Sequence, residues 1–306
     1  MRPCGFLSSV PQRLRSRLVC SALTMLTMVS AASAVSIAGD RLPRVVSLNL
    51  CTDLQLLLLA DPEQIVSLTW LARDPRSSPL AGAAQRFAFN RGQAEDVLPF
   101  APDVVLAGTY STRFTVDLLR RQGVRVIEFA PVTSLDDVAQ TTLRMGAIIG
   151  QEARAQRLVA EFHESLSQTA GVWANHSGDR GPRNRAVLLG AGGFTGGADS
   201  LAGNVLTHLG LVDAARRYGA ESWGRVGLEE LLRLHPDILV ITTGGDASRE
   251  PSMAIEILNH PALHDRALGM RRILAPTTYW SCGTPLVALA AAKLAAAAPA
   301  AASIAP

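Results

Sequence analysis

Apolar residues along this chain follow two alternating patterns. Short uninterrupted apolar runs, which are typical of strands covered on both faces, alternate with segments whose apolar positions recur at helical spacing. The first half predicts strands at 44–50, 65–68, 104–106 and 124–129, and helices at 53–60 and 114–122. The second half begins again with a strand at 185–189 and a helix at 200–209. This alternation predicts an α/β protein with parallel sheets and right-handed crossovers.

One segment of the chain is present twice, at an offset of 134 residues. Residues 95–106 (EDVLPFAPDVVL) correspond to residues 229–240 (EELLRLHPDILV). Each copy predicts a short helix that starts on acidic residues and stops before Pro-Asp, followed by a buried strand. We therefore expect two doubly wound parallel-sheet lobes, an N-terminal Rossmann-like lobe over residues 41–133 and a C-terminal Rossmann-like lobe over residues 183–298.

The region 134–175 has a helical pattern of its own. Ser134, followed by two aspartates, is the predicted N-cap of a helix that continues to about residue 149. After Gly150, apolar residues at helical spacing predict a second, amphipathic helix from residue 152 to about residue 173. We expect this second helix to be a long connector between the lobes.

The N-terminus predicts export from the cytoplasm. Four arginines precede an apolar stretch that is too short for a permanent membrane helix and that ends in small residues. We interpret residues 1–34 as a signal peptide that is cleaved after Ala34, with Ala38 as the alternative site. The mature chain is then expected in the periplasm.

Charge and histidine placement exclude several partners. Without residues 1–34 the chain keeps 25 basic and 26 acidic side chains and no block of Lys and Arg, so nucleic acid is not an expected partner. All six histidines lie at or beyond His163. The first lobe therefore lacks the imidazole ligands of a metal site shared by two lobes, and we expect no bound metal and no cofactor.

Two cysteines, Cys51 and Cys282, remain after removal of the leader. The periplasm permits disulfides, so these residues either pair or stay separate as half-buried thiols. The sequence does not decide between the two alternatives.

The repeated motif and the connector resemble the periplasmic binding proteins for cobalamin and ferric siderophores, over residues 43–295. The resemblance implies a monomer of two lobes joined by one stiff helix, with a ligand between the lobes and an inner-membrane ABC importer as partner. It also implies that the acid opening each repeated helix docks on the importer, and these acids are Glu95 and Glu229. Alone, each is an ordinary helix-start acid, but two carboxylates on two lobes form a two-point latch.

Ligands of parallel sheets bind beyond the carboxyl ends of the strands, where aromatic residues gather in this chain. Five of its seven Trp and Tyr residues fall in these loops. Phe89 and Trp223 each stand six residues before the acid of their motif, where the resemblance places ligand contacts. Arginines in the same loops, including Arg73, suit carboxylates or phosphates. The predicted ligand-binding residues are Trp70, Phe89, Arg91, Tyr110, Arg113, Trp223, Arg225, Tyr279 and Trp280.

The candidate ligands follow from these two residue types. Aromatic faces favour a large, flat, partly apolar ligand such as a corrinoid, whereas the arginines favour an anionic ferric siderophore. Haem is the alternative for a binding protein of the same kind. The sequence leaves this choice open.

A nucleotide-dependent oxidoreductase is the alternative from a different class. Residues 190–197 (GAGGFTGG) follow a strand and approach the dinucleotide fingerprint, but Thr195 stands where that motif requires glycine. The helix after them starts about ten residues beyond the strand, too far for a phosphate-cradling turn, so we expect a flexible rim of the cleft. Because hydrolase and P-loop motifs are also absent from the sequence, we interpret the chain as a binding protein and not an enzyme.

Overall fold

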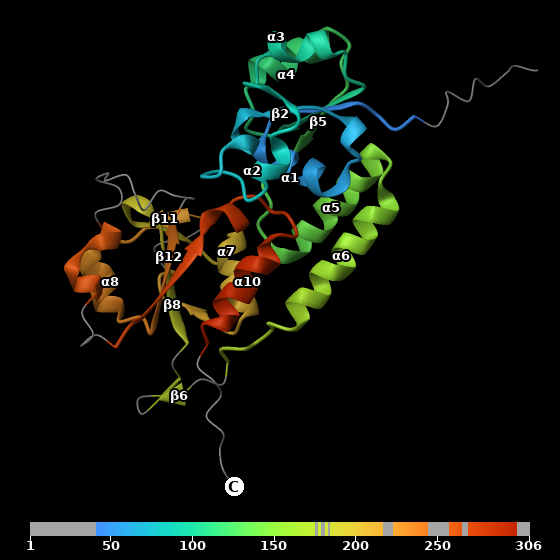
Figure 1. The fold of residues 1–306 in the computed structure, drawn as a ribbon. Helices are drawn as coiled ribbons and strands as arrows, with labels where there is room; N and C mark the ends of the chain where they lie inside the picture. Colours follow the sequence, from blue (N-terminus) through green and yellow to red (C-terminus); the bar gives the residue numbers. More distant parts are fainter. Residues whose placement is uncertain are drawn as a thin grey trace, which may run out of the picture. The chain divides into compact units, whose positions relative to one another are not determined.

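The computed structural model describes residues 41–174, 177–178, 181–182, 184–216, 223–243, 257–264 and 269–298. The predicted signal peptide, residues 1–34, lies outside these ranges. Each half of the chain forms its own parallel sheet (Figure 1), which confirms the predicted α/β class with two doubly wound lobes. Of the helices in the described ranges, none combines the length and apolar character needed to cross a membrane.

The first lobe is built on five parallel strands in the order β3-β2-β1-β4-β5. They are β1 (Val45–Ser47), β2 (Ile65–Thr69), β3 (Ala88–Asn90), β4 (Val104–Gly108) and β5 (Val126–Phe129). The accompanying helices are α1 (Leu50–Leu59), α2 (Ala81–Ala84), α3 (Ala94–Val97) and α4 (Arg113–Arg121). Short 3-10 turns occur at Pro62–Gln64, Trp70–Arg73 and Leu98–Phe100. The sheet is covered on both faces, because Val45 belongs to one hydrophobic cluster and Val46 to another.

The second lobe is built on four parallel strands in the order β10-β8-β12-β13. They are β8 (Arg185–Leu189), β10 (Val212–Asp213), β12 (Ile238–Thr243) and β13 (Arg271–Pro276). Two antiparallel pairs lie outside this sheet, β6 (Ser177–Gly178) with β7 (Gly181–Pro182), and β9 (Phe194–Gly196) with β11 (Trp223–Arg225). The helices are α7 (Leu201–His208), α8 (Leu228–Leu234) and α10 (Val287–Ala296), with 3-10 turns at Ala191–Gly193, Pro261–His264 and Thr277–Tyr279. The glycine-rich segment 190–197 thus contributes β9 to an antiparallel ribbon.

The two copies of the repeated motif adopt the same local structure. In the first lobe α3 and a 3-10 turn lead into β4, and in the second α8 leads into β12. Each helical segment ends on a residue in the left-handed conformation, Ala101 (φ 45°) and His235 (φ 43°). Within the described ranges these are the only non-glycine residues with positive φ. Proline follows each of them and disfavours the right-handed helical conformation there, so both helices stop at equivalent positions.

The aspartate of each Pro-Asp pair fixes the next strand to the first strand of its lobe. The carboxylate of Asp103 accepts a hydrogen bond from the Arg44 amide at 2.7 Å. The carboxylate of Asp237 accepts one from the Arg185 amide at 3.1 Å. The aspartate of the repeated motif therefore has the same structural role in both lobes.

Helices α5 (Leu135–Ile149) and α6 (Glu152–Ser167) lie side by side (Figure 1) and both reach the cores of the two lobes. They contribute Leu135, Val138, Phe162 and Leu166 to the core of the second lobe. They contribute Met145, Ile149 and Ala155 to the core of the first. Helix α6 is thus the predicted connector between the lobes, and α5 packs beside it and also reaches both cores.

Ser134 caps α5 as predicted. Its hydroxyl accepts a hydrogen bond from the Asp137 amide at 3.0 Å, and the Asp137 carboxylate accepts one from the Ser134 amide at 3.1 Å. These two reciprocal bonds form a capping box, which fixes the start of the helix pair.

The predicted end of the connector helix, near residue 173, is wrong. Helix α6 ends at Ser167, and Gly171 follows in the left-handed conformation (φ 62°). The amide of Gly171 donates to the His208 carbonyl, and the amide of Trp173 donates to the Leu209 carbonyl, both at 2.9 Å. The chain leaves the helix because these amides bind the end of α7 instead.

The predicted end of the first strand, at residue 50, is also wrong. Strand β1 stops at Ser47, and Asn49 then caps α1 by accepting a hydrogen bond from the Cys51 amide at 2.9 Å. The apolar run continues through Leu50 into the helix, so hydrophobicity alone did not mark the boundary.

The close contact between α5 and α6 at Gly146 yields a stability prediction. A Cβ atom added at Gly146 would lie 2.4 Å from the Ala155 Cβ and 3.1 Å from the Gln151 carbonyl oxygen. We expect Gly146→Ala to lower the free energy of unfolding by about 1–3 kcal/mol, because the helix pair must separate. Urea denaturation followed by circular dichroism measures this change.

Gly82→Ala is the matched control for Gly146→Ala. Gly82 lies in α2 with nothing within 4 Å of an added Cβ, so alanine should be neutral or stabilise by up to about 1 kcal/mol. Equal destabilisation by the two substitutions would contradict tight packing at Gly146.

Candidate functional site

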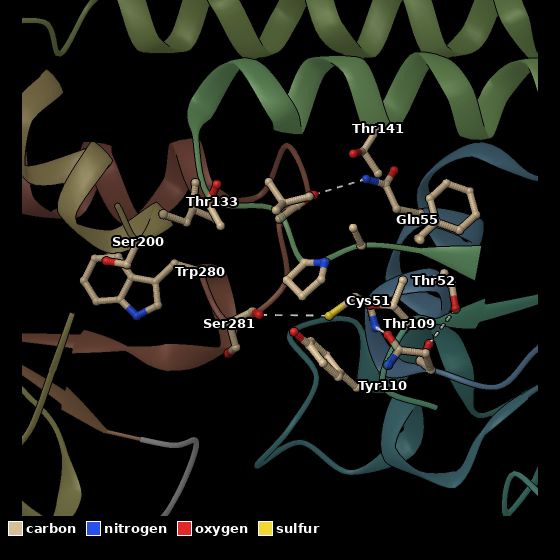
Figure 2. Close-up of a pocket in the computed structure, with 18 of the residues that line it drawn as sticks. Cys51, Thr52, Gln55, Thr109, Tyr110, Thr133, Thr141, Ser200, Trp280 and Ser281 are labelled. Carbon is tan, nitrogen blue, oxygen red and sulfur yellow. Dashed lines mark hydrogen bonds between the residues drawn. The ribbon is translucent and has the colours of Figure 1, made fainter. Parts of the chain in front are cut away.

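A pocket of about 260 Å³ lies between the two lobes. Its walls are the residues that follow β1, β4 and β5 in the first lobe, one face of α5, and the start of α7 with Trp280, Ser281 and Gly283 in the second lobe. Figure 2 shows Tyr110 from the first lobe and Trp280 from the second at this pocket. Much of the lining thus follows the carboxyl ends of parallel strands, as expected for a ligand site in this kind of fold.

Two helices begin at the pocket, and each is capped by a polar residue that lines it. The Asn49 side chain caps α1, and the Ser200 hydroxyl accepts a hydrogen bond from the Gly203 amide at 3.0 Å to cap α7. The amino ends of helices carry partial positive charge. This end of the pocket therefore favours hydrogen-bond acceptors on a ligand.

No charged side chain lines the pocket in the described part of the chain. Its polar groups are hydroxyls, such as those of Thr52, Thr109 and Thr133, and the amides of Asn49 and Gln55. A ligand group with full charge would lose its hydration there without gaining a counter-charge. The lining therefore suits neutral groups that form hydrogen bonds.

A disulfide joins the lobes at the wall of the pocket. Cys51 at the start of α1 is bonded to Cys282, with their Cα atoms 4.9 Å apart. Cys51 also lines the pocket, and its sulfur lies 4.0 Å from the Ser281 carbonyl oxygen, dashed in Figure 2. This approach is a van der Waals contact, because a disulfide sulfur has no hydrogen to donate.

Asp53 is a fully buried carboxyl group beside the pocket residue Thr52. It accepts hydrogen bonds from the amide of Thr69 at 3.1 Å and from the Thr69 hydroxyl at 2.5 Å. Burial raises the pKa of Asp53 to about 7, although hydrogen bonds from Ser47 and Thr69 act in the opposite direction. The contact fixes the end of β2 to α1.

Two of the nine predicted ligand-binding residues, Tyr110 and Trp280, line the pocket. Tyr110 is 87% exposed and stands at its mouth. Trp280 is only 6% exposed and also packs in the core of the second lobe, so it has a structural role as well. Six of the other seven lie outside the lining, and the side chain of Trp223 is outside the described part of the structure.

Exposed Phe89 lies between half-buried Arg73 and exposed Arg91 on the first lobe. The guanidinium carbon of Arg73 lies 5.2 Å, and that of Arg91 5.9 Å, from the centre of the Phe89 ring. In the second lobe Arg225 lies 4.4 Å from the ring centre of the exposed Phe194. Arg91 and Arg225 are equivalent in the repeat, each four residues before its acid, so both lobes present a cation over an exposed ring.

The remaining predicted residues have different surroundings. Trp70 is half-exposed at the start of the 3-10 turn after β2, and Arg113 is exposed at the start of α4. Tyr279 is half-buried against the core of the second lobe. Trp223 belongs to β11, but its side chain lies outside the described part of the structure.

Glu95 and Glu229 are exposed and lie in the first turns of α3 and α8. The side chain of Glu229 is 87% exposed, and Arg233 contacts it at 3.5 Å. Neither acid lines the pocket. Both therefore remain accessible to a partner at equivalent places on the two lobes.

Several pocket residues were missed by sequence reasoning, including Asn49, Gln55, Thr133 and Ser200. Asn49 and Ser200 carried a usable signal, since both are residue types favoured at helix N-caps. Ser200 opens the predicted helix 200–209, whereas Asn49 was placed inside the predicted strand 44–50. Gln55 and Thr133 carried none, because small polar residues in a helix or a loop are common on any surface. Within the described ranges, no three His, Cys, Asp or Glu side chains are grouped so that they could hold a metal ion.

Two lobes with a pocket between them define a ligand-binding protein. The sequence model of the periplasmic binding protein family matches residues 45–268, and the chain belongs to this family. Membership places it among substrate-binding proteins, which are not enzymes, as the sequence predicted.

Two relatives illustrate the range of this similarity. A cobalamin-binding protein of Halobacterium salinarum (strain ATCC 29341 / DSM 671 / R1) is 28% identical over 225 residues, which cover 71% of this chain and 58% of that protein. The chain thus spans less than two thirds of the length of that relative. The structure of the periplasmic heme-binding protein RhuT from Roseiflexus sp. RS-1 in apo form has a TM-score of 0.67 and 20% identity, covering 84% of this chain and 97% of its own. At this identity the likeness shows the fold alone.

A second kind of relative matches less of the chain. An NAD(P)H dehydrogenase (quinone) from Rhodopseudomonas palustris (strain BisA53) is 32% identical over 125 residues, which cover 40% of this chain and 60% of that protein. More than half of this chain lies outside the match. The family model, in contrast, matches residues 45–268. The partial similarity to the dehydrogenase therefore does not support the oxidoreductase alternative.

Burial of Asp53 generates a prediction about pH. Between the usual aspartate pKa of 3.8 and about 7, the folded protein keeps the Asp53 proton whereas the unfolded chain releases it. Stability contributed by this group is therefore full below pH 4 and decreases as the pH rises towards 7. We expect the difference in free energy of unfolding between the natural protein and Asp53→Asn to change by about 3 kcal/mol between pH 5 and pH 8.

Asparagine is the informative substitution because it removes the titrating proton, while its amide oxygen can still accept the hydrogen bond from the Thr69 amide. Denaturant titrations at several pH values measure the effect. Asp136→Asn, at an exposed position of α5, is the control. Its free energy of unfolding should change with pH in the same way as that of the natural protein. If the free energy of unfolding of Asp53→Asn also changed with pH as that of the natural protein does, the pKa of Asp53 would not be raised.

Proposed function

We propose that this protein is exported to the periplasm, captures a corrinoid in the inter-lobe pocket and delivers it to an inner-membrane ABC importer, acting as a monomer. The observation that supports this ligand is the pocket lining, in which the described residues supply hydroxyl, amide, aromatic and disulfide groups but no charged side chain. The cobalamin-binding relative from Halobacterium salinarum supports the same class of ligand.

Corrinoids carry carboxamide groups on the rim of the macrocycle. Such groups are neutral, and their carbonyl oxygens match the threonine hydroxyls and the starts of α1 and α7 at the pocket. Haem carries carboxylates instead, and in the described lining a carboxylate would meet only the partial positive charge of these helix starts and no cationic side chain. The pocket therefore favours the amide-bearing ligand.

The volume of the pocket limits how much of the ligand enters it. Ligand pockets that enclose a drug-sized molecule measure about 300–1,000 Å³, and this one measures about 260 Å³. A corrinoid is larger than a typical drug, so one edge enters the pocket and the rest lies outside it. Tyr110, exposed at the mouth, is positioned to stack on the outer part.

An anionic ligand, either a ferric siderophore or haem, is the second candidate. The observation that favours it is the pair of cationic groups over exposed rings, Arg73 and Arg91 at Phe89 and Arg225 at Phe194. A guanidinium fork binds carboxylates, and the ring beside it stacks on a flat ligand. The solved structure of a periplasmic heme-binding protein with the same fold is consistent with this alternative.

Delivery requires contacts with the importer, and Glu95 with Glu229 are the proposed contacts. Both are exposed in the first turn of equivalent helices, so the two lobes present one carboxylate each. Two charge-assisted contacts fix the orientation of a partner, which one contact alone does not achieve.

Tyr110→Ala tests the ligand proposal. We expect purified natural protein to bind cyanocobalamin, and Tyr110→Ala to bind it about 10-fold more weakly, since aromatic stacking contributes about 0.5–1.5 kcal/mol beyond area burial. Quenching of tryptophan fluorescence measures the affinity, with haemin and a ferric siderophore titrated in parallel.

Phe114→Ala is the control, because Phe114 is 67% exposed but does not line the pocket. Its affinity for cyanocobalamin should equal that of the natural protein. Binding of haemin or the siderophore in preference to cyanocobalamin would replace the first candidate by the second.

Substitution of both acids tests the importer contacts. We expect Glu95→Ala with Glu229→Ala to abolish ligand uptake by cells while the affinity in solution stays within a few-fold, since neither acid lines the pocket. Uptake of labelled ligand and fluorescence titration measure the two quantities.

Glu63→Ala with Glu152→Ala is the matched control, because both are exposed acids in first turns elsewhere in the first lobe and the helix pair. This control should transport normally. A collapse of solution affinity in the Glu95 and Glu229 variant would instead assign these acids to the ligand site.

A further inference from the structure

Helix α1 presents two side chains to a loop of the opposite lobe. Cys51 and Gln55 are four residues apart and therefore lie on one face of the helix. Cys51 is bonded to Cys282, and the Gln55 side-chain amide donates to the Gly283 carbonyl at 3.3 Å. The same amide donates to the Thr142 hydroxyl on α5 at 3.2 Å, so both of its hydrogens have acceptors.

A third contact holds the same loop from another side. A Cβ atom added at Gly283 would lie 2.1 Å from the Cβ of Val132, in the segment that leads from β5 to α5. The backbone at Gly283 is therefore packed directly on the first lobe. A covalent bond, a hydrogen bond and a close packing contact thus meet within two adjacent residues, Cys282 and Gly283.

The pocket is built from the same residues. Cys51, Gln55 and Val132 line it from the first lobe, and Trp280, Ser281 and Gly283 line it from the loop. The position of Trp280 relative to Tyr110 therefore depends on how the loop is held. If the loop moved away from α1, this wall of the pocket would be lost.

We propose that Cys51, Gln55 and the loop Trp280–Thr284 form an inter-lobe clamp that sets the shape of the pocket before ligand arrives. Cys51, Cys282 and Gln55 are positioning residues, because they act by holding Trp280 and Ser281 in place. The effect on ligand affinity rests on the proposed function, but the effect on the loop does not.

The geometry of the clamp limits opening of the lobes at the pocket. The Cα atoms of Cys51 and Cys282 are 4.9 Å apart, and disulfides span at most about 6.8 Å between these atoms. The lobes can therefore separate by only about 2 Å at this point while the bond is intact. The helix pair α5/α6 holds the lobes at a second place, so hinge opening is restricted at both.

The experiment compares three forms of the full-length mature protein: oxidised, reduced and desalted, and carrying Cys51→Ser with Cys282→Ser. Hydrogen exchange measures the amides of residues 280–284, and titration with cyanocobalamin and with haemin measures affinity. We expect the reduced and serine forms to agree with each other. Relative to the oxidised form, exchange in the loop should rise at least 10-fold and affinity should fall at least 10-fold, with unchanged helical circular dichroism.

Gln55→Met keeps the disulfide and similar volume but removes both hydrogen bonds, so it tests the clamp even if the cysteine variant does not fold. We expect exchange of the Gly283 and Thr284 amides to rise about 3-fold or more. Gln122→Met, at an exposed position after α4, should leave these amides unchanged.

Equal loop exchange in the oxidised, serine and Gln55→Met forms would overturn the clamp. Faster exchange with unchanged affinity for a bound probe would show that the loop does not position the pocket, and would overturn that part of the proposal. If the oxidised protein bound neither probe, the proposed function would fail, while the exchange comparison would still decide whether the clamp exists.

Discussion

Burial of apolar side chains from α5 and α6 in both lobes is the interaction on which the rest of the structure depends. Each large apolar side chain contributes about 1.5–3 kcal/mol when it is buried. Each of the two helices contributes side chains to both cores, as α5 contributes Val138 to the core of the second lobe and Met145 to that of the first. Neither lobe can therefore move far from the helix pair without exposing apolar surface. This packing also fixes part of the pocket wall, because α5 lines the pocket.

The repeated motif explains how one sequence pattern serves two lobes. Its proline stops a helix on a left-handed residue, and its aspartate ties the following strand to the first strand of the sheet. These are structural tasks that each lobe needs. Glu95 and Glu229 are exposed and belong to neither described core. Their equivalence in the two lobes supports the proposal that they contact the importer.

Much of the fold could be predicted from the sequence, because buried strands and amphipathic helices leave periodic patterns. The N-cap at Ser134 and the stop before each Pro-Asp depend on residues close in sequence, and these predictions were confirmed. The end of α6 could not be predicted in the same way. It depends on hydrogen bonds from Gly171 and Trp173 to the end of α7, about 35 residues further along the chain, and such contacts leave no local pattern.

The candidate site was predicted only in part, for a related reason. Aromatic residues are conspicuous, and two of those predicted, Tyr110 and Trp280, do line the pocket. Half of the described lining consists of threonine, serine, glycine, asparagine and glutamine residues. Their chemistry becomes specific only when the fold brings them together, as it brings Gln55 to Gly283.

Charge is distributed unevenly over the proposed ligand-binding region, and this bears on what the protein can hold. Among the residues that the structure describes, the inner pocket has no charged lining, whereas Arg73, Arg91 and Arg225 stand over exposed rings outside it. An ion pair in water contributes little, but a buried uncompensated charge is costly. A ligand that presents neutral groups inward loses nothing by this arrangement, and negative groups on its outer edge would still meet cations. On the proposed function, we therefore expect the pocket to select against charged groups that face inward, and the arginines to accept negative groups on the outer edge of a ligand without requiring them.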